Sequence, residues 1–315
     1  MTRTVAITGG TGFIGRHLVA RHVALGDRVR YLTRRMPTEE IPGVGAHVGD
    51  LNSPETLRHF VQGVDVLYHC AAELRDANEM EKANVAGTAN LLEAAVGKIG
   101  RWVQLSSTGL YGNVRRGEVC EESDIKPGNP YEWSKAAADV LVLEAAGKQN
   151  LSCVLLQPSN VYGADMPNQS LFHLISMIDK GLFFFIGPCG AMANYIHVEN
   201  VVDALLSCAN ATLPANGRSY IVSDYCSLEE FTGIIAVHLG KQAPHMRLPE
   251  LPVRMLAKAC GWMPGFPLST SRVDALTGRT IYRTDRIESE LGHHNNISLE
   301  TGMGELVGYW KNGTN

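Results

Sequence analysis

The sequence predicts an α/β fold in which a doubly wound parallel sheet is joined to a smaller C-terminal lobe. Short β-type runs alternate with helical stretches through the first half of the 315 residues, a pattern typical of a parallel sheet covered by helices on both faces. Three spaced glycines follow the first of these runs. Beyond Pro158 the alternation gives way to glycines, prolines and short helices, which indicates a second lobe.

The predicted elements follow one another in a regular order. Strands are predicted at Val5–Thr8, Val29–Thr33, Ala46–Gly49, Val64–Cys70, Trp102–Ser106, Ser152–Gln157 and Ser219–Ser223. Helices are predicted at Phe13–Leu25, Asn84–Val96, Tyr131–Ala146 and Val201–Ala209. A further helix begins after Ser53, because serine is a favourable N-cap and Pro54 a favourable first helical residue. A later strand is expected at Tyr195–Val198.

Composition and charge exclude several classes of protein. Hydrophobic residues make up 45% and charged residues 19%, which excludes a disordered chain. The 28 basic and 32 acidic residues form no basic cluster, so neither nucleic acid nor an anionic membrane is expected as a partner. The seven cysteines form no C-x-x-C pair, which predicts no metal site and no disulfide framework. With no leader or long apolar run recognised, a cytoplasmic location is expected.

The spacing of Gly9, Gly12 and Gly15 predicts a dinucleotide-binding turn. Glycines at this spacing allow a tight turn, a close approach of the backbone to a pyrophosphate, and close packing of helix on strand. The N-terminus of the following helix supplies N–H donors and a partial positive charge to the same phosphates.

The end of the second strand predicts which nicotinamide cofactor binds. NAD sites usually have an acidic residue there that binds the ribose hydroxyls, whereas this chain has Thr33-Arg34-Arg35. Two guanidinium groups can bind a 2′-phosphate, so NADP(H) is expected to be preferred over NAD(H). In the alternative interpretation, both arginines are solvated surface charges.

Tyr131 and Lys135 are candidates for the catalytic chemistry. Their separation of four residues places both on one face of a predicted helix, where an ammonium favours the charged form of a nearby phenol. Lys135 can also bond a cofactor ribose. Ser106 and Ser107 end the fifth strand, at the edge of the sheet where α/β sites form, and a hydroxyl there can hold a substrate oxygen.

With these motifs in place, the chain resembles the extended short-chain dehydrogenase/reductase family, in its NAD(P)-dependent epimerase/dehydratase group. The resemblance runs through nearly the whole chain and depends on Thr8–Gly15, Asp50-Leu51, Tyr68–Ala72, Asn84–Thr88, Ser106–Gly112, Tyr131 with Lys135, Pro158–Gly163 and His197–Val202. It implies that Ser107 orients a substrate oxygen, Tyr131 is the general acid/base, and Lys135 lowers the pKa of that tyrosine.

The resemblance also implies a Rossmann core, at residues 1–165 and about 194–224, and a substrate-binding lobe, at about 166–193 and 225–315. A homodimer would form through the helices that begin at Asn84 and Tyr131. Together with the residue arguments above, it predicts cofactor contacts from Gly9, Thr11, Gly12, Phe13, Ile14, Gly15, Arg34, Arg35, Asp50, Leu51, Ala71, Ala72, Asn84, Tyr131, Lys135, Pro158, Asn160 and Val161. Substrate contacts are expected from Ser107, Thr108, Asn160 and Tyr162.

Departures from the family pattern bear on the substrate. Thr108-Gly109 stands where sugar-nucleotide dehydratases carry an Asp-Glu pair, which disfavours dehydration. Nucleotide-sugar enzymes of the family often have an arginine just before the segment that begins at His197, whereas this chain has Ala193-Asn194-Tyr195 there. A diphosphate could instead be bound by Arg218, His245, Arg247 or Arg254. The leading hypothesis is a 4-keto reductase or 4-epimerase acting on a nucleotide-activated sugar. The alternatives are a 3β-hydroxysteroid-dehydrogenase-like enzyme acting on a sterol-like or other apolar alcohol, and a non-catalytic NADP-binding regulator.

Overall fold

A seven-stranded parallel sheet forms the centre of the molecule. The computed structural model describes residues 2–37, 42–149, 151–212, 216–260 and 268–313. The sheet has the order β11-β7-β5-β4-β1-β2-β3, with every pairing parallel. Its strands are β1 (Thr4–Thr8), β2 (Arg28–Thr33), β3 (Val44–Val48), β4 (Val64–His69), β5 (Ile99–Leu105), β7 (Cys153–Pro158) and β11 (Arg218–Val222). The predicted fold class is therefore confirmed.

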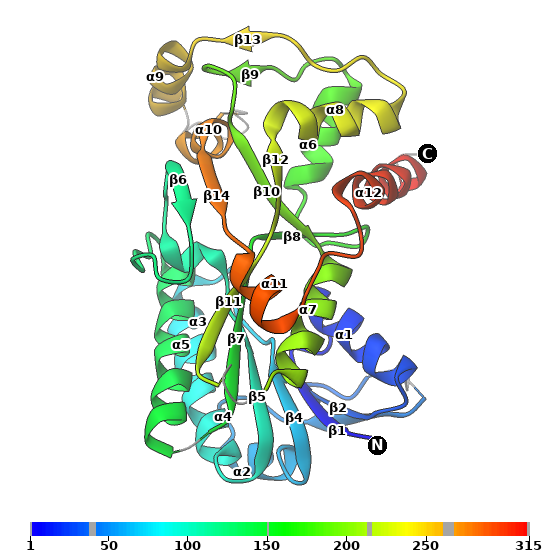
Figure 1. Cartoon of the computed structure of the whole chain (residues 1–315), viewed down its shortest axis with the longest axis vertical. Helices are drawn as coiled ribbons and strands as arrows, with labels where there is room; N and C mark the ends of the chain where they lie inside the picture. Colours follow the sequence, from blue (N-terminus) through cyan, green and yellow to red (C-terminus); the bar gives the residue numbers. More distant parts are fainter. Residues whose placement is uncertain (1, 38–41, 150, 213–215, 261–267, 314–315) are drawn as a thin grey trace.

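Helices cover both faces of this sheet, as Figure 1 shows. One face packs against α1 (Phe13–Ala24) and α7 (Val198–Asn210), and the other against α2 (Pro54–Phe60), α4 (Gly87–Ala95) and α5 (Pro130–Gln149). Consecutive residues of a strand point to opposite faces, so Ile7 of β1 lies in the first core and Ala6 in the second. Because both faces are buried, the central strands are continuous apolar runs.

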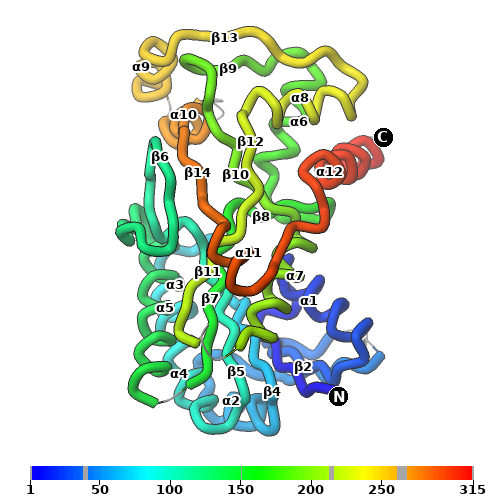
Figure 2. Tube along the Cα trace, viewed as in Figure 1, coloured from blue at the N-terminus to red at the C-terminus, as the bar shows by residue number. Residues whose placement is uncertain are grey.

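The lobe lies beyond the carboxyl ends of the strands (Figure 2). A three-stranded sheet, β12 (Asp224–Ser227), β10 (Met192–His197) and β8 (Asn160–Tyr162), packs with α6 (Ser170–Asp179), α8 (Leu228–Leu239) and α12 (Leu299–Gly313) around a separate core. The tip is formed by β9 (Phe185–Ile186), β13 (Arg247–Leu248), α9 (Glu250–Cys260) and α10 (Thr270–Thr277).

Two segments join the lobe to the sheet domain. Strand β6 (Arg116–Val119), which follows the short 3₁₀ helix η2 (Thr108–Tyr111), pairs in parallel with β14 (Arg279–Tyr282). Next along the chain comes α11 (Asp285–Leu291), whose Ile287 is buried in the core on the α1 side of the sheet. The C-terminal part of the chain thus returns to the sheet domain before it ends in the lobe.

The seven predicted strands of the sheet are all present, and other elements differ from the prediction. The helix predicted from Asn84 is preceded by α3 (Ala77–Met80) and by η1 (Glu81–Ala86), a π-helical turn that contains Asn84. Val198 begins α7 instead of ending a strand. The pairing of β6 with β14 was not predicted, because the two strands are short, rich in polar residues and far apart in the sequence.

Candidate active site

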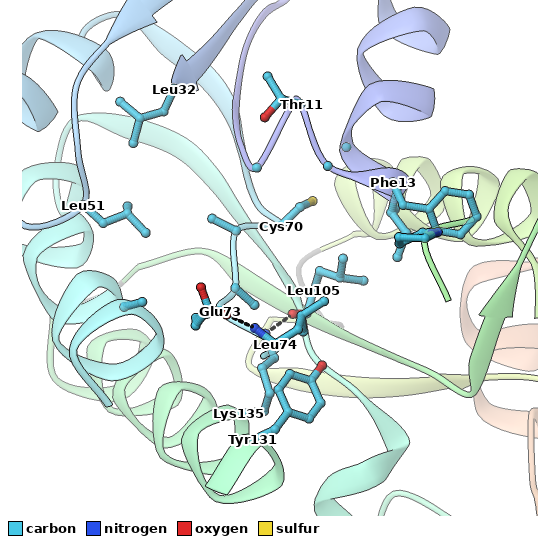
Figure 3. Close-up of a pocket in the computed structure, with 18 of the residues that line it drawn as sticks. Thr11, Phe13, Leu32, Leu51, Cys70, Glu73, Leu74, Leu105, Tyr131 and Lys135 are labelled. Atoms are coloured by element: carbon cyan, nitrogen blue, oxygen red, sulfur yellow. Dashed lines mark hydrogen bonds between the residues drawn. The ribbon is translucent and has the colours of Figure 1, made fainter. Parts of the chain in front are cut away.

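A cavity of about 1510 Å³ opens at the carboxyl edge of the sheet. It lies where the strand order reverses between β1 and β4, the usual ligand position in open α/β sheets. Small-molecule sites are typically about 300–1,000 Å³, so this volume suits a dinucleotide together with a substrate. Figure 3 shows Thr11 and Phe13 on one side of the cavity and Tyr131 and Lys135, from α5, on another.

The glycine turn between β1 and α1 depends on the missing side chains. A Cβ on Gly9, where φ is +70°, would lie 2.7 Å from the Ala71 nitrogen, and a Cβ on Gly15 would lie 2.0 Å from the Gly9 oxygen. The first turn of α1 has no acidic residue, and its N-cap, Gly12, makes no side-chain cap. The backbone N–H groups of this turn are therefore suited to bind an anion.

A chain of hydrogen bonds fixes the same edge of the sheet. His69 lies between two hydroxyls, with Nδ1 2.6 Å from Thr8 Oγ1 and Nε2 2.9 Å from Thr88 Oγ1. Thr88 donates to the Asn84 carbonyl, so His69 Nε2 must donate to Thr88. His69 Nδ1 then accepts from Thr8, which in turn accepts from the Ala71 N–H. Burial lowers the pKa of His69 to about 3, so the imidazole is neutral, as this chain requires.

Ser107 and Tyr131 both line the cavity. Ser107 is the N-cap of η2 and accepts from the Gly109 N–H at 3.0 Å. Burial raises the pKa of the Tyr131 phenol, and a hydrogen bond with the Ser107 side chain acts in the opposite direction. Buried Lys135 donates from Nζ to the Leu105 carbonyl, and its own pKa is lowered by burial. Ser107 thus acts against the effect of burial on this tyrosine, and the role expected of Lys135 toward Tyr131 stays a prediction.

The two arginines after β2, Arg34 and Arg35, also line the cavity, with Asp50 and Leu51. No acidic residue lies in β2 or among the described residues 34–37 that follow it. Glu73, which follows β4, lines the same cavity, and its Oε1 accepts from the N–H groups of the next three residues. These hydrogen bonds, with a smaller effect of Arg34, lower the pKa of Glu73.

The structure brings most of the predicted site residues together. Every predicted cofactor-binding residue except Asn84 lines the cavity, as do Ser107 and Asn160 of the substrate set. The cavity is also lined by residues that the sequence analysis missed, among them Cys70, Glu73, Leu74, Lys82, Leu105, Met166, Pro167 and Asn168. Several of these residues follow β4 or the Pro158–Gly163 motif closely in the sequence. Their location just after the carboxyl end of a strand is the sequence signal that indicates them.

Three predicted site residues lie away from the cavity lining. Asn84 is buried, with its amide fully used: Nδ2 donates to the Glu73 carbonyl and to Ser134 Oγ, and Oδ1 accepts from the Glu73 N–H. Asn84 therefore connects the loop at Glu73 to α5 by hydrogen bonds. Tyr162 is only 1% exposed and packs in the core of the lobe. Thr108 is also buried and bonds Tyr282.

The cations proposed to meet a diphosphate do not line the cavity either. Arg247 pairs with Glu229 at 2.6 Å, Arg254 pairs with Asp274 at 2.6 Å, and Arg218 pairs with Glu290. His245 is exposed. Within the described part of the chain, the cations that line the cavity are Arg34, Arg35, Lys82 and Lys135.

The described residues hold no group of three or more His, Cys, Asp or Glu side chains placed to bind a metal ion. Nor do they include a helix long and apolar enough to cross a membrane.

The chain was compared with known families and proteins. The profile of the family described as "NAD dependent epimerase/dehydratase family" matches residues 5–222. A similar protein is the 4-hydroxy-2-methyl-3-oxo-4-farnesyl-3,4-dihydroquinoline-1-oxide ketoreductase of Stigmatella aurantiaca, which is 29% identical over 95% of this chain and 94% of the relative. The UDP-glucose 4-epimerase of Vibrio cholerae is 24% identical over 96% of this chain and 94% of its own.

Solved structures share the fold along the whole chain. A putative epimerase from Burkholderia cenocepacia superposes with a TM-score of 0.79 and 21% identity, covering 98% of both chains. The UDP-glucuronic acid 4-epimerase of Bacillus cereus, solved in complex with NAD, gives a TM-score of 0.78 and 18% identity, covering 99% of this chain and 100% of its own.

Proposed function

Since the chain belongs to the NAD dependent epimerase/dehydratase family, an extended short-chain dehydrogenase/reductase group of NAD(P)-dependent enzymes, we propose that it interconverts a secondary alcohol and a ketone. The observation that carries this proposal is the placement of Ser107, Tyr131 and Lys135 on the wall of one cavity that also contains the glycine turn. An intact serine, tyrosine and lysine set argues against a non-catalytic regulator.

The roles of the three side chains follow from their positions. A nicotinamide cofactor, when bound, supplies or accepts the hydride. Ser107 Oγ holds the substrate oxygen, and Tyr131 Oη donates a proton to that oxygen in reduction or takes it in oxidation. Because burial raises the pKa of Tyr131, the phenol stays protonated at neutral pH, which suits ketone reduction. Lys135 lies within reach of the same face of the cavity and can donate to the cofactor ribose.

For the cofactor we favour NADP(H) over NAD(H). The support is electrostatic: Arg34 and Arg35 line the cavity directly after β2, and neither β2 nor the described residues 34–37 after it carry a carboxylate. The adenosine half of the cofactor would lie beside Asp50 and Leu51.

For the substrate, the geometry favours a ketone or alcohol of an apolar molecule over a nucleotide-activated sugar. Side-chain cations often neutralise a substrate diphosphate, and the arginines considered for that role are paired with carboxylates away from the cavity. Residues 261–267, outside the described part, carry no charged residue. The Stigmatella aurantiaca relative is by name a ketoreductase of a farnesyl-bearing quinoline, whereas the Vibrio cholerae relative is a nucleotide-sugar epimerase. The nucleotide sugar is the second candidate because of this likeness.

Oxidation of NADPH tests the proposal. The purified protein is incubated with NADPH and two panels of ketones, one farnesyl- or sterol-like and one of nucleotide 4-keto sugars. We expect turnover with the apolar panel, and a decrease of about 10²–10⁴-fold in Tyr131→Phe at nearly unchanged NADPH affinity, because the substitution removes the positioned proton. Turnover with the nucleotide sugars alone would contradict the substrate assignment. Full activity in Tyr131→Phe would contradict the assignment of the general acid/base.

A further inference from the structure

A buried carboxylate lies behind the proposed catalytic residues and has no part in the mechanism above. Asp139 follows Lys135 by four residues and Tyr131 by eight, so the three side chains form one column on α5. Asp139 is 5% exposed and accepts a hydrogen bond from Ser106 Oγ. Burying a charged carboxylate this deeply costs free energy unless a nearby opposite charge compensates it.

Lys135, one helical turn away on α5, supplies an opposite charge without a direct ion pair, and both side chains bind the same end of β5. Lys135 Nζ donates to the Leu105 carbonyl, and the next residue, Ser106, donates to Asp139. Ser107 comes next and lines the cavity. Two side chains of α5 thus bind the last residue of β5, Leu105, and the residue after it, Ser106, directly before Ser107.

The charges of the pair support each other. Burial lowers the pKa of Lys135, and Asp139 is the largest influence in the opposite direction. Burial raises the pKa of Asp139 to about 6, against the effects of Lys135, Ser106 and Gln104.

Other titratable groups face this pair from the neighbouring elements. Tyr111 of η2, Cys70 directly after β4 and Cys153 of β7 have pKa values raised by burial, so they stay neutral near pH 7.

We propose, on the basis of the function proposed above, that Asp139 is a positioning residue: held by Ser106, it keeps Lys135 as an ammonium and sets the register of α5 on β5 in which Tyr131 meets Ser107. Asp139 touches neither substrate nor cofactor in this role, since it is absent from the cavity lining. Its effect reaches the reaction through Lys135 and Tyr131.

The pH dependence of ketone reduction tests this role with Asp139→Asn. The carboxylate raises the pKa of both Lys135 and Tyr131, so its removal lowers both values. We expect the alkaline limb of the rate profile to move to lower pH by about one unit, which corresponds to a tenfold change in the ionisation equilibrium. Glu144→Gln is the matched control, because Glu144 is an exposed carboxylate on the same helix that pairs with Lys148. Its profile should not move.

Ser106→Ala provides an independent measurement. The carboxylate is retained but loses a hydrogen bond that favours its charged form, so the acidic limb of the profile should move to higher pH. If Asp139→Asn does not fold, the pH profile of Ser106→Ala tests the proposal in its place. If the pH–rate profiles of both variants keep the limbs of the parent, with or without a lower melting temperature, Asp139 only contributes to packing and the proposal is overturned.

A protein without turnover on any ketone would count against the proposed function alone. Binding of NADPH, followed by its fluorescence, then tests Asp139 directly. Affinity should decline at lower pH in Asp139→Asn than in the parent, because the Lys135 ammonium is lost earlier as the pH rises. Parallel binding curves would overturn the proposal.

Discussion

Arg34 lines the cavity near a carboxylate that is already engaged by three N–H groups. A 2′-phosphate that binds the Arg34 guanidinium therefore leaves Glu73 with its three backbone hydrogen bonds. Charge-assisted hydrogen bonds contribute about 1.5–3 kcal/mol, so Arg34→Ala should weaken NADPH binding roughly ten- to a hundredfold and leave NADH binding nearly unchanged. Titrations of both cofactors check this, with Arg35→Ala as the comparison. Tighter binding of NADH by the parent would refute the NADP(H) preference.

Asn200 provides a second test at single-residue scale. Its side chain is fully buried, donates from Nδ2 to the Ile297 carbonyl at 2.8 Å, and accepts from the Ile297 N–H at 2.9 Å. An ionised aspartate at this position cannot donate to that carbonyl. Asn200→Asp should lower the free energy of unfolding by about 1–3 kcal/mol in chemical denaturation. In Asn210→Asp, the control, only an acceptor for Arg3 is needed, so stability should be retained. Equal stability of both variants would count against this argument.

Sequence motifs predicted which residues lie near the cavity better than which way their side chains point. The glycine turn, Tyr131 and Lys135 were found because loop chemistry and helical spacing determine them locally. Asn84 and Tyr162 belong to motifs just as recognisable, yet both side chains point into packed surroundings. Their orientation depends on contacts with α5 and with the lobe, which no local pattern encodes.

At the scale of elements, the hydrogen-bond chain through His69 connects β1, β4 and α4. The pKa of His69 is about 3 in the folded protein, well below the ordinary 6.5 of an unfolded chain, so the unfolded state binds more protons between these values. This contribution to stability is complete above pH 6.5 and is lost as the pH falls, by about 1 kcal/mol per pH unit. Denaturation between pH 7 and 4 should show a shallower decline for His69→Gln than for the parent. His59→Gln, an exposed site on α2, should follow the parent. Identical slopes for the parent and His69→Gln would refute the lowered pKa, and with it the neutral state, of this imidazole.

The alternation of apolar runs with helical stretches was enough to predict the seven central strands, because burial on both faces makes each strand visible in the sequence. The β6–β14 pair was not visible. Its partners are separated by more than 150 residues, and their side chains are largely polar, so no local pattern in the sequence indicates their pairing. The π-helical turn η1 was also missed, since a single widened turn leaves the apolar period almost unchanged.

For the whole molecule, the exposed side of α5 supports the homodimer expected from the family resemblance. Trp133 and Val140 are each 50% exposed, Leu143 is 37% exposed, and their spacing places them on one side of the helix. We propose that this side packs against a second copy of the chain. Light scattering should give about twice 34.2 kDa for the parent and for Val237→Glu, and about 34.2 kDa for Val140→Glu. Val237 is 71% exposed on α8 of the lobe and therefore controls for the added charge. A monomeric parent would contradict this assembly.

The return of the chain through β14 and α11 limits how the protein can be recombined with its relatives. The family match ends at residue 222, but Ile287 fills the core beneath the sheet and β14 pairs with β6. A chain cut after β11 would leave an apolar gap and an open strand edge, and such edges readily pair with other chains. A chimaera that exchanges the lobe for that of another family member must therefore keep residues 279–291 from the same parent as the sheet, so that the crossover points fall on either side of this returning segment.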